Sequence, residues 1–295
     1  MLVLLGPTAT GKSQLAVEIA KQISGEIISA DSMQVYRGMD IGTAKPTLSE
    51  RQNIPHHLID ILNPDQAWTV SDFVKETQRL TREIMNQGRV PMIVGGTGLY
   101  LRAWLEGFSF PLAPPNPELR TRLEKEPPAT LHAQLSEVDP VAANKIHIHD
   151  KKRIVRALEV YAFTGKRMSD LQSKTPSTDF EQKLIGLNLP REALYQRINE
   201  RVGQMIAKGL IEEVRGLLAK GFSKTLPSLQ ALGYKEVIEY LDGKWTKEQM
   251  TEELKKRTRN FARRQMTWFK RFKSVVWFES QVDMAAVLAY IGEHD

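Results

Sequence analysis

Two glycines, a lysine and a serine stand near the N-terminus at a spacing that can hold a phosphate group. They belong to the segment Gly6-Pro7-Thr8-Ala9-Thr10-Gly11-Lys12-Ser13, which fits every fixed position of the P-loop pattern. The glycines let the backbone fold around an anion, so that amides and the start of the next helix face it. Lys12 adds a positive charge, and the Ser13 hydroxyl suits a phosphate-bound Mg²⁺. The segment predicts a phosphate site but not whose phosphates bind, because nucleotide hydrolases and kinases use the same cradle.

A carboxylate follows the second apolar run of the chain, in Ala30-Asp31-Ser32-Met33-Gln34. The carboxyl ends of parallel strands open into one crevice, so Asp31 should lie beside the P-loop if the second strand neighbours the first. A carboxylate near bound phosphates is unfavourable unless it holds a metal or takes a proton. Ser32 and Gln34 supply donors and acceptors suited to the edge of a base. The alternative is an Asp-Ser helix cap or turn.

A second glycine-rich turn, Gly95–Tyr100, follows the apolar run Pro91–Val94. No acidic residue ends this run, where a P-loop hydrolase often carries its metal-binding carboxylate, although Asp60 could take that place. An Asn-Lys-x-Asp guanine motif is also missing from the sequence, so we do not expect a GTPase.

The elements that must position these residues alternate between strand and helix. Six short apolar runs read as strands: Leu2–Leu5, Glu26–Ser29, His57–Leu62, Pro91–Val94, Leu184–Leu189 and Val275–Phe278. Helical patterns at Ser13–Ile23 and Val70–Gln87 follow two of them. We therefore expect an α/β fold with a P-loop NTPase-like parallel sheet flanked by helices.

Proline is dense between Pro111 and Pro128, which suggests a boundary. We expect a catalytic core with C-terminal helices over residues 1–115 and 183–295, and a mainly helical insertion over residues 116–182. Residues 191–273 look almost wholly helical, with breaks near Gly221–Pro227 and Gly243–Trp245.

Every charged residue from Lys255 to Lys273 is basic, namely Lys255, Lys256, Arg257, Arg259, Arg263, Arg264, Lys270, Arg271 and Lys273. A solvated helix face usually mixes charge signs, so this run favours contact with a polyanion over a plain solvated face. The aromatic residues in the run recur near helical spacing, which indicates core packing rather than base stacking. They are Phe261, Trp268, Phe269 and Phe272.

Composition narrows the class of protein. The chain has 295 residues, of which 41% are hydrophobic and 26% charged, with a net charge of +6 and no cysteine. Such a chain can build one large or two modest cores, and it has no apolar run long enough for a membrane span. Without cysteine it has neither disulfides nor cysteine-ligated zinc, and the paired histidines His56/His57 and His147/His149 do not have the spacing of a zinc site on one helix face. Leu2–Leu5 does not read as a signal peptide, so we expect a cytoplasmic protein.

Eight motifs together resemble the tRNA isopentenyltransferase family, also called tRNA dimethylallyltransferase or IPP transferase. They occur in the family's order from residue 6 to about 271. Beside the P-loop they are Asp31-Ser-Met-Gln-Val-Tyr36, Gly42-Thr-Ala-Lys-Pro46, His56-His57-Leu58, Val94-Gly-Gly-Thr-Gly-Leu-Tyr100, Arg153-Ile-Val-Arg-Ala-Leu-Glu159, Leu232-Gly-Tyr-Lys-Glu236 and Arg263-Arg-Gln-Met-Thr-Trp268.

The resemblance implies that a dimethylallyl group moves from dimethylallyl diphosphate to the exocyclic N6 amine of an adenine. That adenine lies 3′ of the anticodon in tRNAs reading codons that begin with U. The P-loop would then hold the diphosphate of the prenyl donor rather than ATP. Asp31 would be the general base, and Lys12, the amides of Thr8 to Ser13 and a Mg²⁺ near Ser13 would stabilise the leaving diphosphate.

The resemblance also implies residues that contact the anticodon stem-loop of the tRNA. They are Asp31, Ser32, Met33, Gln34, Thr97, Arg120, Lys152, Arg153, Arg156, Gln230, Gly233 and Lys235. We expect a monomer that contacts no membrane.

Three other functions stay open at this point. A related isopentenyltransferase could use a free nucleotide as the acceptor, although a small acceptor needs neither the insertion nor the basic C-terminal helix. The P-loop could serve an ATP-dependent kinase of small molecules. A non-catalytic RNA-binding protein gated by phosphate would leave Asp31 without a purpose.

Overall fold

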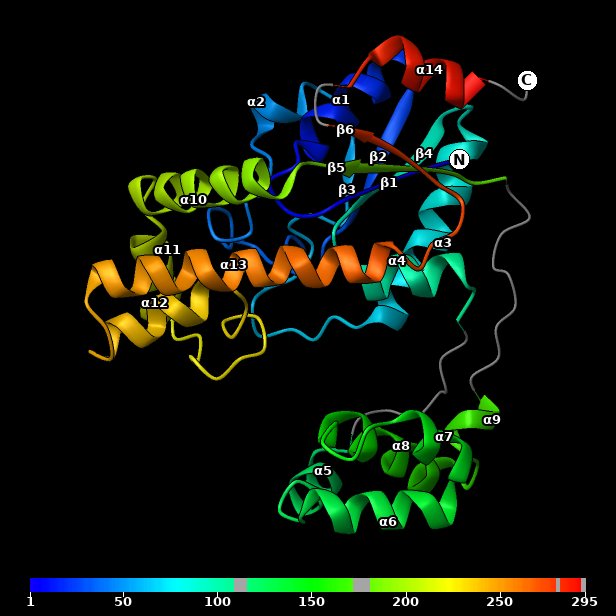
Figure 1. The fold of residues 1–295 in the computed structure, drawn as a ribbon, viewed down its shortest axis with the longest axis vertical. Helices are drawn as coiled ribbons and strands as arrows, with labels where there is room; N and C mark the ends of the chain where they lie inside the picture. The colour runs from blue at the N-terminus through cyan, green and yellow to red at the C-terminus, as the bar shows by residue number, and fades with distance from the viewer. Residues whose placement is uncertain (109–115, 172–180, 280–281, 293–295) are drawn as a thin grey trace. The chain divides into compact units, whose positions relative to one another are not determined.

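The computed structural model describes residues 1–108, 116–171, 181–279 and 282–292. The chain divides into two compact units, Met1–Arg102 with Phe180–Asp295, and Ala103–Asp179 (Figure 1). Much of the proline-dense stretch expected to mark a boundary, residues 111–115, lies outside the described residues.

The larger unit is built on a parallel sheet of six strands in the order β3-β2-β4-β1-β5-β6. The strands are β1 Leu2–Leu5, β2 Gly25–Ala30, β3 His56–His57, β4 Val90–Gly95, β5 Lys183–Asn188 and β6 Val275–Glu279. The predicted parallel α/β fold is confirmed. The order differs from the simplest expectation, because β4 lies between β1 and β2.

The expected third strand is much shorter than predicted. The sequence pattern indicated a strand over His57–Leu62, but pairing in β3 covers only His56 and His57. Leu58 and Asp60 have φ angles of 62° and 57°, and such left-handed residues cannot continue a strand. An isolated bridge between Tyr36 and Leu62 is what remains of the expected pairing.

Helices cover the sheet and extend beyond it. They are α1 Lys12–Gln22, α2 Leu48–Arg51, α3 Val70–Asn86, α4 Gly98–Leu105, α10 Arg191–Ala207, α11 Leu210–Ala219, α12 Tyr234–Leu241, α13 Lys247–Phe269 and α14 Met284–Gly292. The long helices α10 and α13 pack against each other (Figure 1). No helix among the described residues is both long enough and apolar enough to cross a membrane.

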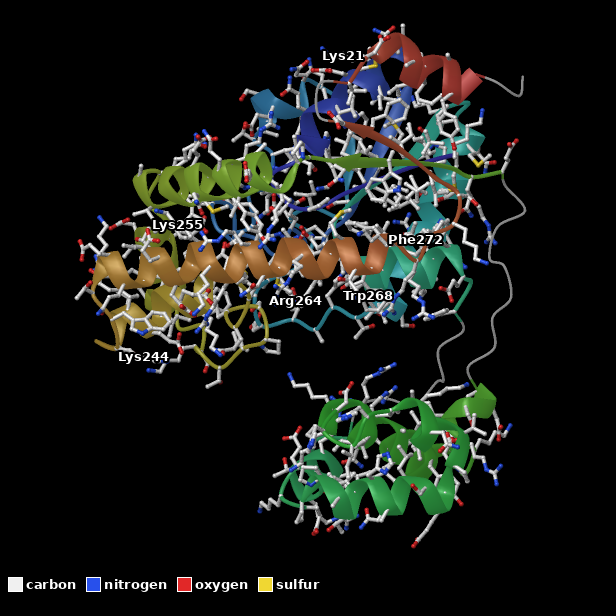
Figure 2. All side chains as sticks on the ribbon, in the orientation of Figure 1. Lys21, Lys244, Lys255, Arg264, Trp268 and Phe272 are labelled. Carbon is white, nitrogen blue, oxygen red and sulfur yellow. The ribbon has the colours of Figure 1, made fainter. Side chains whose placement is uncertain are left out.

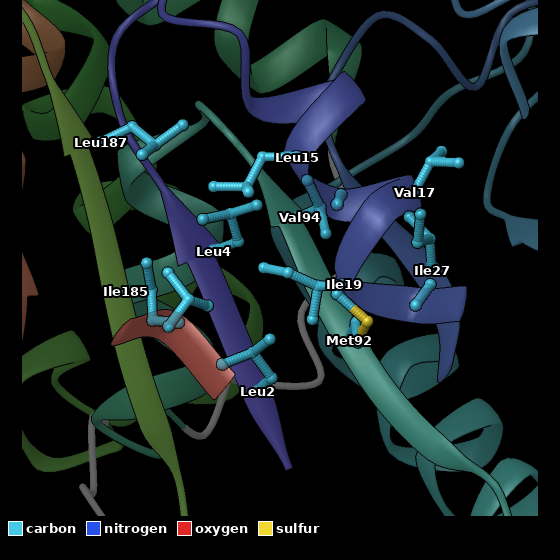
Figure 3. Close-up of a cluster of buried hydrophobic side chains, with 13 residues drawn as sticks. Leu2, Leu4, Leu15, Val17, Ile19, Ile27, Met92, Val94, Ile185 and Leu187 are labelled. Carbon is cyan, nitrogen blue, oxygen red and sulfur yellow. The ribbon is translucent and has the colours of Figure 1, made fainter. Parts of the chain in front are cut away.

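The core of this unit fixes the strand that leads into the P-loop. Leu2 and Leu4 of β1 pack against Leu15 and Ile19 of α1, with Ile185 of β5 in the same cluster (Figure 3). These five side chains are buried. Because both flanks of the loop belong to one close-packed cluster, the loop between them has a fixed position.

The smaller unit is helical in its described part. Its helices are α5 Pro117–Leu123, α6 Pro128–Val138, α7 Pro140–Lys145, α8 Lys151–Thr164 and α9 Met168–Leu171. Leu131 and Leu135 of α6 pack with Ile154 and Leu158 of α8 in a core of its own. Side-chain caps from Asn116, Asp139 and Asp150 begin α5, α7 and α8.

Candidate active site

The P-loop bends tightly between β1 and α1. Gly6 has a φ of 155°, and a Cβ there would lie 2.5 Å from the carbonyl oxygen of Leu187. Ala9 and Gly11 also have positive φ angles, 66° and 90°. Helix α1 begins at Lys12 directly after the loop, so its first amides lack intrahelical partners. The loop therefore ends in the backbone arrangement that binds anions.

Not every amide of the loop is available to a ligand. The amide of Thr8 donates to Oε1 of Gln265 at 2.9 Å. Ser13, by contrast, is solvent-exposed in the first turn of α1. Of the amides of Thr8 to Ser13 that were expected to face an anion, that of Thr8 is therefore engaged within the protein.

Lys12 lies over its own loop. Its Nζ donates to the carbonyl oxygen of Pro7 at 2.6 Å. Burial, together with the positive charge of Arg201, lowers the pKa of the Lys12 ammonium to about 7, against the opposing influence of Asp31. A negatively charged ligand in the loop would stabilise the protonated form of Lys12 and so raise its pKa.

Asp31 directly follows β2, and its carboxylate is held by its own turn. Its Oδ1 accepts from the amides of Met33 at 2.8 Å and Gln34 at 3.3 Å. Burial raises the pKa of Asp31, although the two amides, Lys12 and Arg201 oppose the rise. The turn that was the alternative interpretation of Asp31 is thus present, and the same carboxylate is a stronger base than an exposed one.

The glycine-rich turn explains how Asp31 reaches the P-loop although β2 does not neighbour β1. A Cβ on Gly95 would lie 2.3 Å from the carbonyl oxygen of Ala30, so only glycine allows β4 this close to the end of β2. Thr97 donates its amide to that same carbonyl at 3.1 Å, and its hydroxyl accepts from the amide of Ser32 at 3.1 Å. The turn therefore supports the residues that flank Asp31.

Arg201 is a site residue that the sequence analysis missed. It lies on α10, and its charge interacts with both Asp31 and Lys12; burial lowers its pKa. It belongs to no local motif. The one available signal is its position three residues after Ile198 and seven after Leu194, which places a charge on the buried face of an amphipathic helix.

Two other predicted RNA-contacting side chains beside Asp31 are engaged within the protein. Gln34 accepts from the Ser29 hydroxyl at 3.1 Å and donates to the carbonyl of Thr43 at 3.4 Å. The Thr97 hydroxyl accepts from the amide of Ser32. These contacts orient both side chains without saturating the hydrogen-bonding capacity of either.

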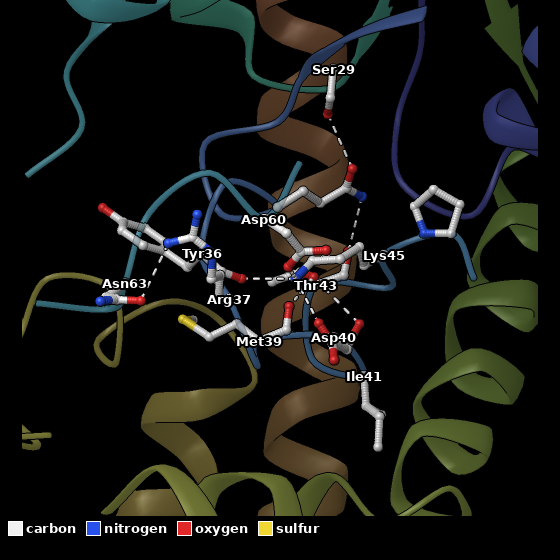
Figure 4. A network of polar contacts seen from close by, with 12 residues as sticks. Ser29, Tyr36, Arg37, Met39, Asp40, Ile41, Thr43, Lys45, Asp60 and Asn63 are labelled. Carbon is white, nitrogen blue, oxygen red and sulfur yellow. Dashed lines mark hydrogen bonds and ion pairs between the residues drawn. The ribbon is translucent and has the colours of Figure 1, made fainter. Parts of the chain in front are cut away.

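The loop after Asp31 is held from two sides. Lys45 is nearly buried, and its Nζ donates to the carbonyl of Tyr36 at 2.7 Å and pairs with Asp40 and Asp60 at 2.6 Å each (Figure 4). Glu213 of α11 accepts from the backbone amides of residues 40, 41 and 42. Asp60 is therefore engaged in an ion pair, and no cluster of three acidic or histidine side chains in the described ranges could hold a metal.

The predicted contact segment Gln230–Lys235 lies against this same loop. Gly233 has a φ of 97° and precedes α12, and a Cβ on Gly42 would lie 2.4 Å from the ring of Tyr234. Gln230 is exposed and donates its side-chain amide to a backbone carbonyl, and Lys235 is half-buried. The structure thus brings Gly233 and the Asp31 loop together through Gly42.

In the helical unit, two of the predicted RNA-contacting arginines are bound to a buried carboxylate. Glu159 is 0% exposed and accepts from Arg120 at 2.8 Å, from Arg156 and from the amide of Asn116. Lys152 and Arg153 are exposed on the first turn of α8. Arg120 and Arg156 therefore have a structural partner, whereas Lys152 and Arg153 face solvent.

The expectation of an unpaired basic run was wrong for its first part. Lys255 pairs with Glu252 at 2.7 Å, and Arg257 pairs with both Glu253 and Glu236. The acidic partners lie on the turn before the run or on α12, outside the window in which the charges were counted. Further along, Arg263 and Arg264 of α13 and Lys270 just after its end are exposed and make no ion pair with the described residues; Arg264 is labelled in Figure 2.

The aromatic residues of the basic run pack against the protein as predicted rather than forming an exposed platform. Phe269 of α13 is fully buried, and Phe261 and Trp268 of α13 and Phe272 beyond its end are half-buried. A Cβ on Gly98 would lie 2.7 Å from Trp268, so this ring rests directly on the glycine-rich turn.

The fold and the site define a P-loop protein of the α/β class in which two cations and a carboxylate surround a phosphate cradle. Comparison with known proteins gives the family. Residues 34–272 match the family model described as IPP transferase, and residues 1–63 match one described as isopentenyl transferase. The chain belongs to the IPP transferase family, whose members are prenyltransferases.

Two relatives of similar length share one name. The tRNA dimethylallyltransferase of Pelotomaculum thermopropionicum is 49% identical over 283 residues, which cover 95% of this chain and 90% of that protein. The enzyme of the same name from Carboxydothermus hydrogenoformans is 50% identical over 286 residues, covering 95% and 92%.

Solved structures of tRNA-modifying transferases are similar to this chain in sequence and in fold. The tRNA isopentenylpyrophosphate transferase of Bacillus halodurans is 41% identical with a TM-score of 0.73, covering 98% of this chain and 93% of that one. A eukaryotic dimethylallyltransferase acting on tRNA is 29% identical with a TM-score of 0.84, covering 97% and 74%.

Replacing Arg120 by methionine should loosen the helical unit whether or not RNA is present. The change removes one of the two hydrogen bonds to each oxygen of the buried Glu159 carboxylate, leaving only the amide of Asn116 and Arg156 as donors, which should reduce local stability by about 1–3 kcal/mol. Hydrogen exchange of the α5 and α8 amides measures this. Arg122→Met on the same helix is the control, because Arg122 is exposed. Equal exchange rates in the two variants would contradict the structural role.

Proposed function

We propose that the protein transfers a dimethylallyl group from dimethylallyl diphosphate to the exocyclic N6 amine of the adenine 3′ of the anticodon in tRNAs reading codons that begin with U. Membership of the IPP transferase family and the name shared by its relatives support this reaction. The observation that carries the proposal is the half-buried carboxylate of Asp31, which interacts electrostatically with Lys12 and Arg201 beside a P-loop.

The donor side consists of the loop from Ala9 to Ser13, Lys12 and Arg201. Their positive charge and amides suit a diphosphate, on which negative charge grows as the allylic carbon–oxygen bond breaks. One preorganised donor of this kind is worth about 3–4 kcal/mol in a transition state. The electron pair of the broken bond leaves with the diphosphate.

The exposed Ser13 hydroxyl at the start of α1 fits a Mg²⁺ ion bound chiefly by the diphosphate and water. The described residues offer no cage of acidic side chains, which agrees with the few protein ligands that Mg²⁺ usually takes. Such an ion would offset part of the diphosphate charge.

On the acceptor side, Asp31 acts as the general base. The lone pair of an exocyclic adenine amine is delocalised into the ring, so this amine is a poor nucleophile. As the new carbon–nitrogen bond forms, the amine loses a proton, and Asp31 takes it. General base catalysis of this kind contributes roughly 10²- to 10⁴-fold in rate. The raised pKa of Asp31 suits the role because it makes the carboxylate a better proton acceptor.

The RNA is held by basic side chains and by residues around Asp31. The adenine must leave the anticodon loop to reach a half-buried carboxylate, and bases in single-stranded loops are accessible to such splaying. Arg263 and Arg264 on α13 are exposed and suit the phosphate backbone. Lys152 and Arg153 on the helical unit are also exposed and also suit the phosphate backbone. The monomeric state and the cytoplasmic location stay predictions.

A single assay tests the proposal. The protein is incubated with labelled dimethylallyl diphosphate and either tRNA or free AMP, with and without Mg²⁺. We expect label in tRNA only, and only with Mg²⁺. Label in AMP would instead identify a free-nucleotide acceptor, to which the match of residues 1–63 to an isopentenyl transferase model is relevant. Consumption of ATP without either product would indicate a kinase.

In the same assay, Asp31→Asn should abolish transfer while RNA binding persists. Asparagine keeps an oxygen that can accept from the amides of Met33 and Gln34, so the turn survives, but it cannot take a proton at neutral pH. Asp31→Ala should lose transfer as well. Turnover close to that of the unchanged protein in the asparagine variant would defeat the assignment of the base.

Donor binding should be accompanied by proton uptake. In the free protein the pKa of Lys12 is about 7, and a bound diphosphate must raise it. At pH 8 binding therefore takes up close to one proton, and affinity falls as the pH rises above 7. Calorimetry in buffers of different ionisation enthalpy measures the uptake. Lys12→Arg keeps a permanent charge and should bind without uptake; equal uptake in both proteins would exclude Lys12 as the source.

Replacing Arg263 and Arg264 by alanine should weaken tRNA binding and flatten its salt dependence. Each lost contact with a single-stranded phosphate reduces the slope of log K against log[salt] by about 0.7. The control is Lys255→Ala with Lys256→Ala, which removes two charges from the same helix that are already paired with Glu252 and Glu253. If both double variants keep the original slope, this helix does not contact phosphate.

A further inference from the structure

Gln265 is a buried amide that the proposed reaction has not yet used. It lies on α13 and is 5% exposed. Its Oε1 accepts from the amide of Thr8 in the P-loop at 2.9 Å, and its Nε2 donates to the carbonyl of Gly96 in the glycine-rich turn at 2.9 Å. One side chain thus uses both ends of its amide to join two loops.

The fit at this point is tight. A Cβ on Gly96 would lie 2.4 Å from Nε2 of Gln265, so the amide can occupy this place only beside glycine. Three residues later on the same helix, Trp268 rests on Gly98. The backbone of the turn is therefore packed directly against the side chains of α13, and a buried amide with both partners satisfied has no nearby alternative.

The contacts continue from the turn to the catalytic carboxylate. Thr97 follows Gly96, and it bonds through its amide to Ala30 and through its hydroxyl to the amide of Ser32. Ala30 and Ser32 are the residues on either side of Asp31. A chain of hydrogen bonds thus runs from the donor loop through Gln265 and the turn to the Asp31 loop.

We propose that Gln265 is a positioning residue for the transfer, which sets the P-loop at a fixed distance from the loop that carries Asp31. The sheet does not set this distance directly, because β4 separates β1 from β2. The inference rests on the proposed function, in which the donor lies in the P-loop and the acceptor amine meets Asp31. Gln265 touches neither substrate in this arrangement.

This role predicts a loss of rate without a matching loss of binding. A misplacement of about 1 Å between reacting groups can lower a rate by about 100-fold. The anion-binding amides of Ala9 to Ser13 and the exposed arginines of α13 do not depend on the Gln265 amide. Its loss should therefore lower the rate constant of transfer in the ternary complex far more than the affinity for either substrate.

The test uses Gln265→Met, which keeps the length of the side chain and removes both hydrogen bonds. With saturating dimethylallyl diphosphate and tRNA, the single-turnover rate constant should fall about 10- to 100-fold, while both dissociation constants change little. Gln249→Met, at the opposite end of α13, is the matched control and should keep the full rate. If Gln265 were needed only for folding, Gln265→Met would lower the fraction of active molecules and leave the rate constant of those molecules unchanged. An unchanged rate constant would overturn the proposal.

A second variant tests the hydrogen bonds themselves. In Gln265→Glu the ionised carboxylate can accept from the Thr8 amide but cannot donate to the Gly96 carbonyl, whereas the protonated acid can do both. The rate of this variant relative to the unchanged protein should rise as the pH falls, and the ratio for Gln265→Met should stay constant. A ratio for the glutamate variant that does not change with pH counts against the proposal.

The outcomes separate this inference from the proposed function. If the unchanged protein transfers no label to tRNA, the proposed function fails, and this inference fails with it. If the unchanged protein transfers label normally and Gln265→Met keeps the full rate, only this inference is overturned.

Discussion

Three half-buried charges, those of Lys12, Arg201 and Asp31, constrain the rest of the site. Two cations close together are unfavourable away from water, and one carboxylate offsets only part of their charge. Burial lowers the pKa of both Lys12 and Arg201, and the charge of Arg201 lowers that of Lys12 further, whereas burial raises the pKa of Asp31. A diphosphate would relieve the cations. The site is therefore more favourable with a polyanion than without one, which is the physical basis for binding a phosphorylated donor here.

Local sequence predicted the parts of this site that depend on local geometry. The P-loop could be recognised because glycine, lysine and serine have defined tasks at fixed offsets, and the structure has the strand, turn and helix that the pattern requires. Arg201 gave no comparable signal, because its partners lie more than 150 residues away in the sequence. Asp31 was expected beside the P-loop only if the second strand neighbours the first, and that condition does not hold. Short strands do not reveal their neighbours, so β4 between β1 and β2 could only be found in the structure.

The basic run shows why counting charges within one window misleads. Partners on a helix lie three or four residues away, so acidic residues just before the window, such as Glu252 and Glu253, neutralise its first turn. Glu159 gave a similar result in the helical unit, because this acid binds Arg156 of its own motif and Arg120 of α5, both of which were predicted to contact RNA. By contrast, the fold class and the packing of the α13 aromatics followed from periodicity, which reports burial directly.

Helix α13 combines two tasks that are usually separate. One face carries Gln265 and Phe269 into the interior, and adjacent positions carry Arg263 and Arg264 to the solvent. A 3.6-residue repeat places such neighbours on different sides of one rigid rod. In the proposed function, RNA on the exposed side would contact the same helix that binds the P-loop and the glycine-rich turn through Gln265. The P-loop and the arginines proposed to meet RNA are thus supported by one element.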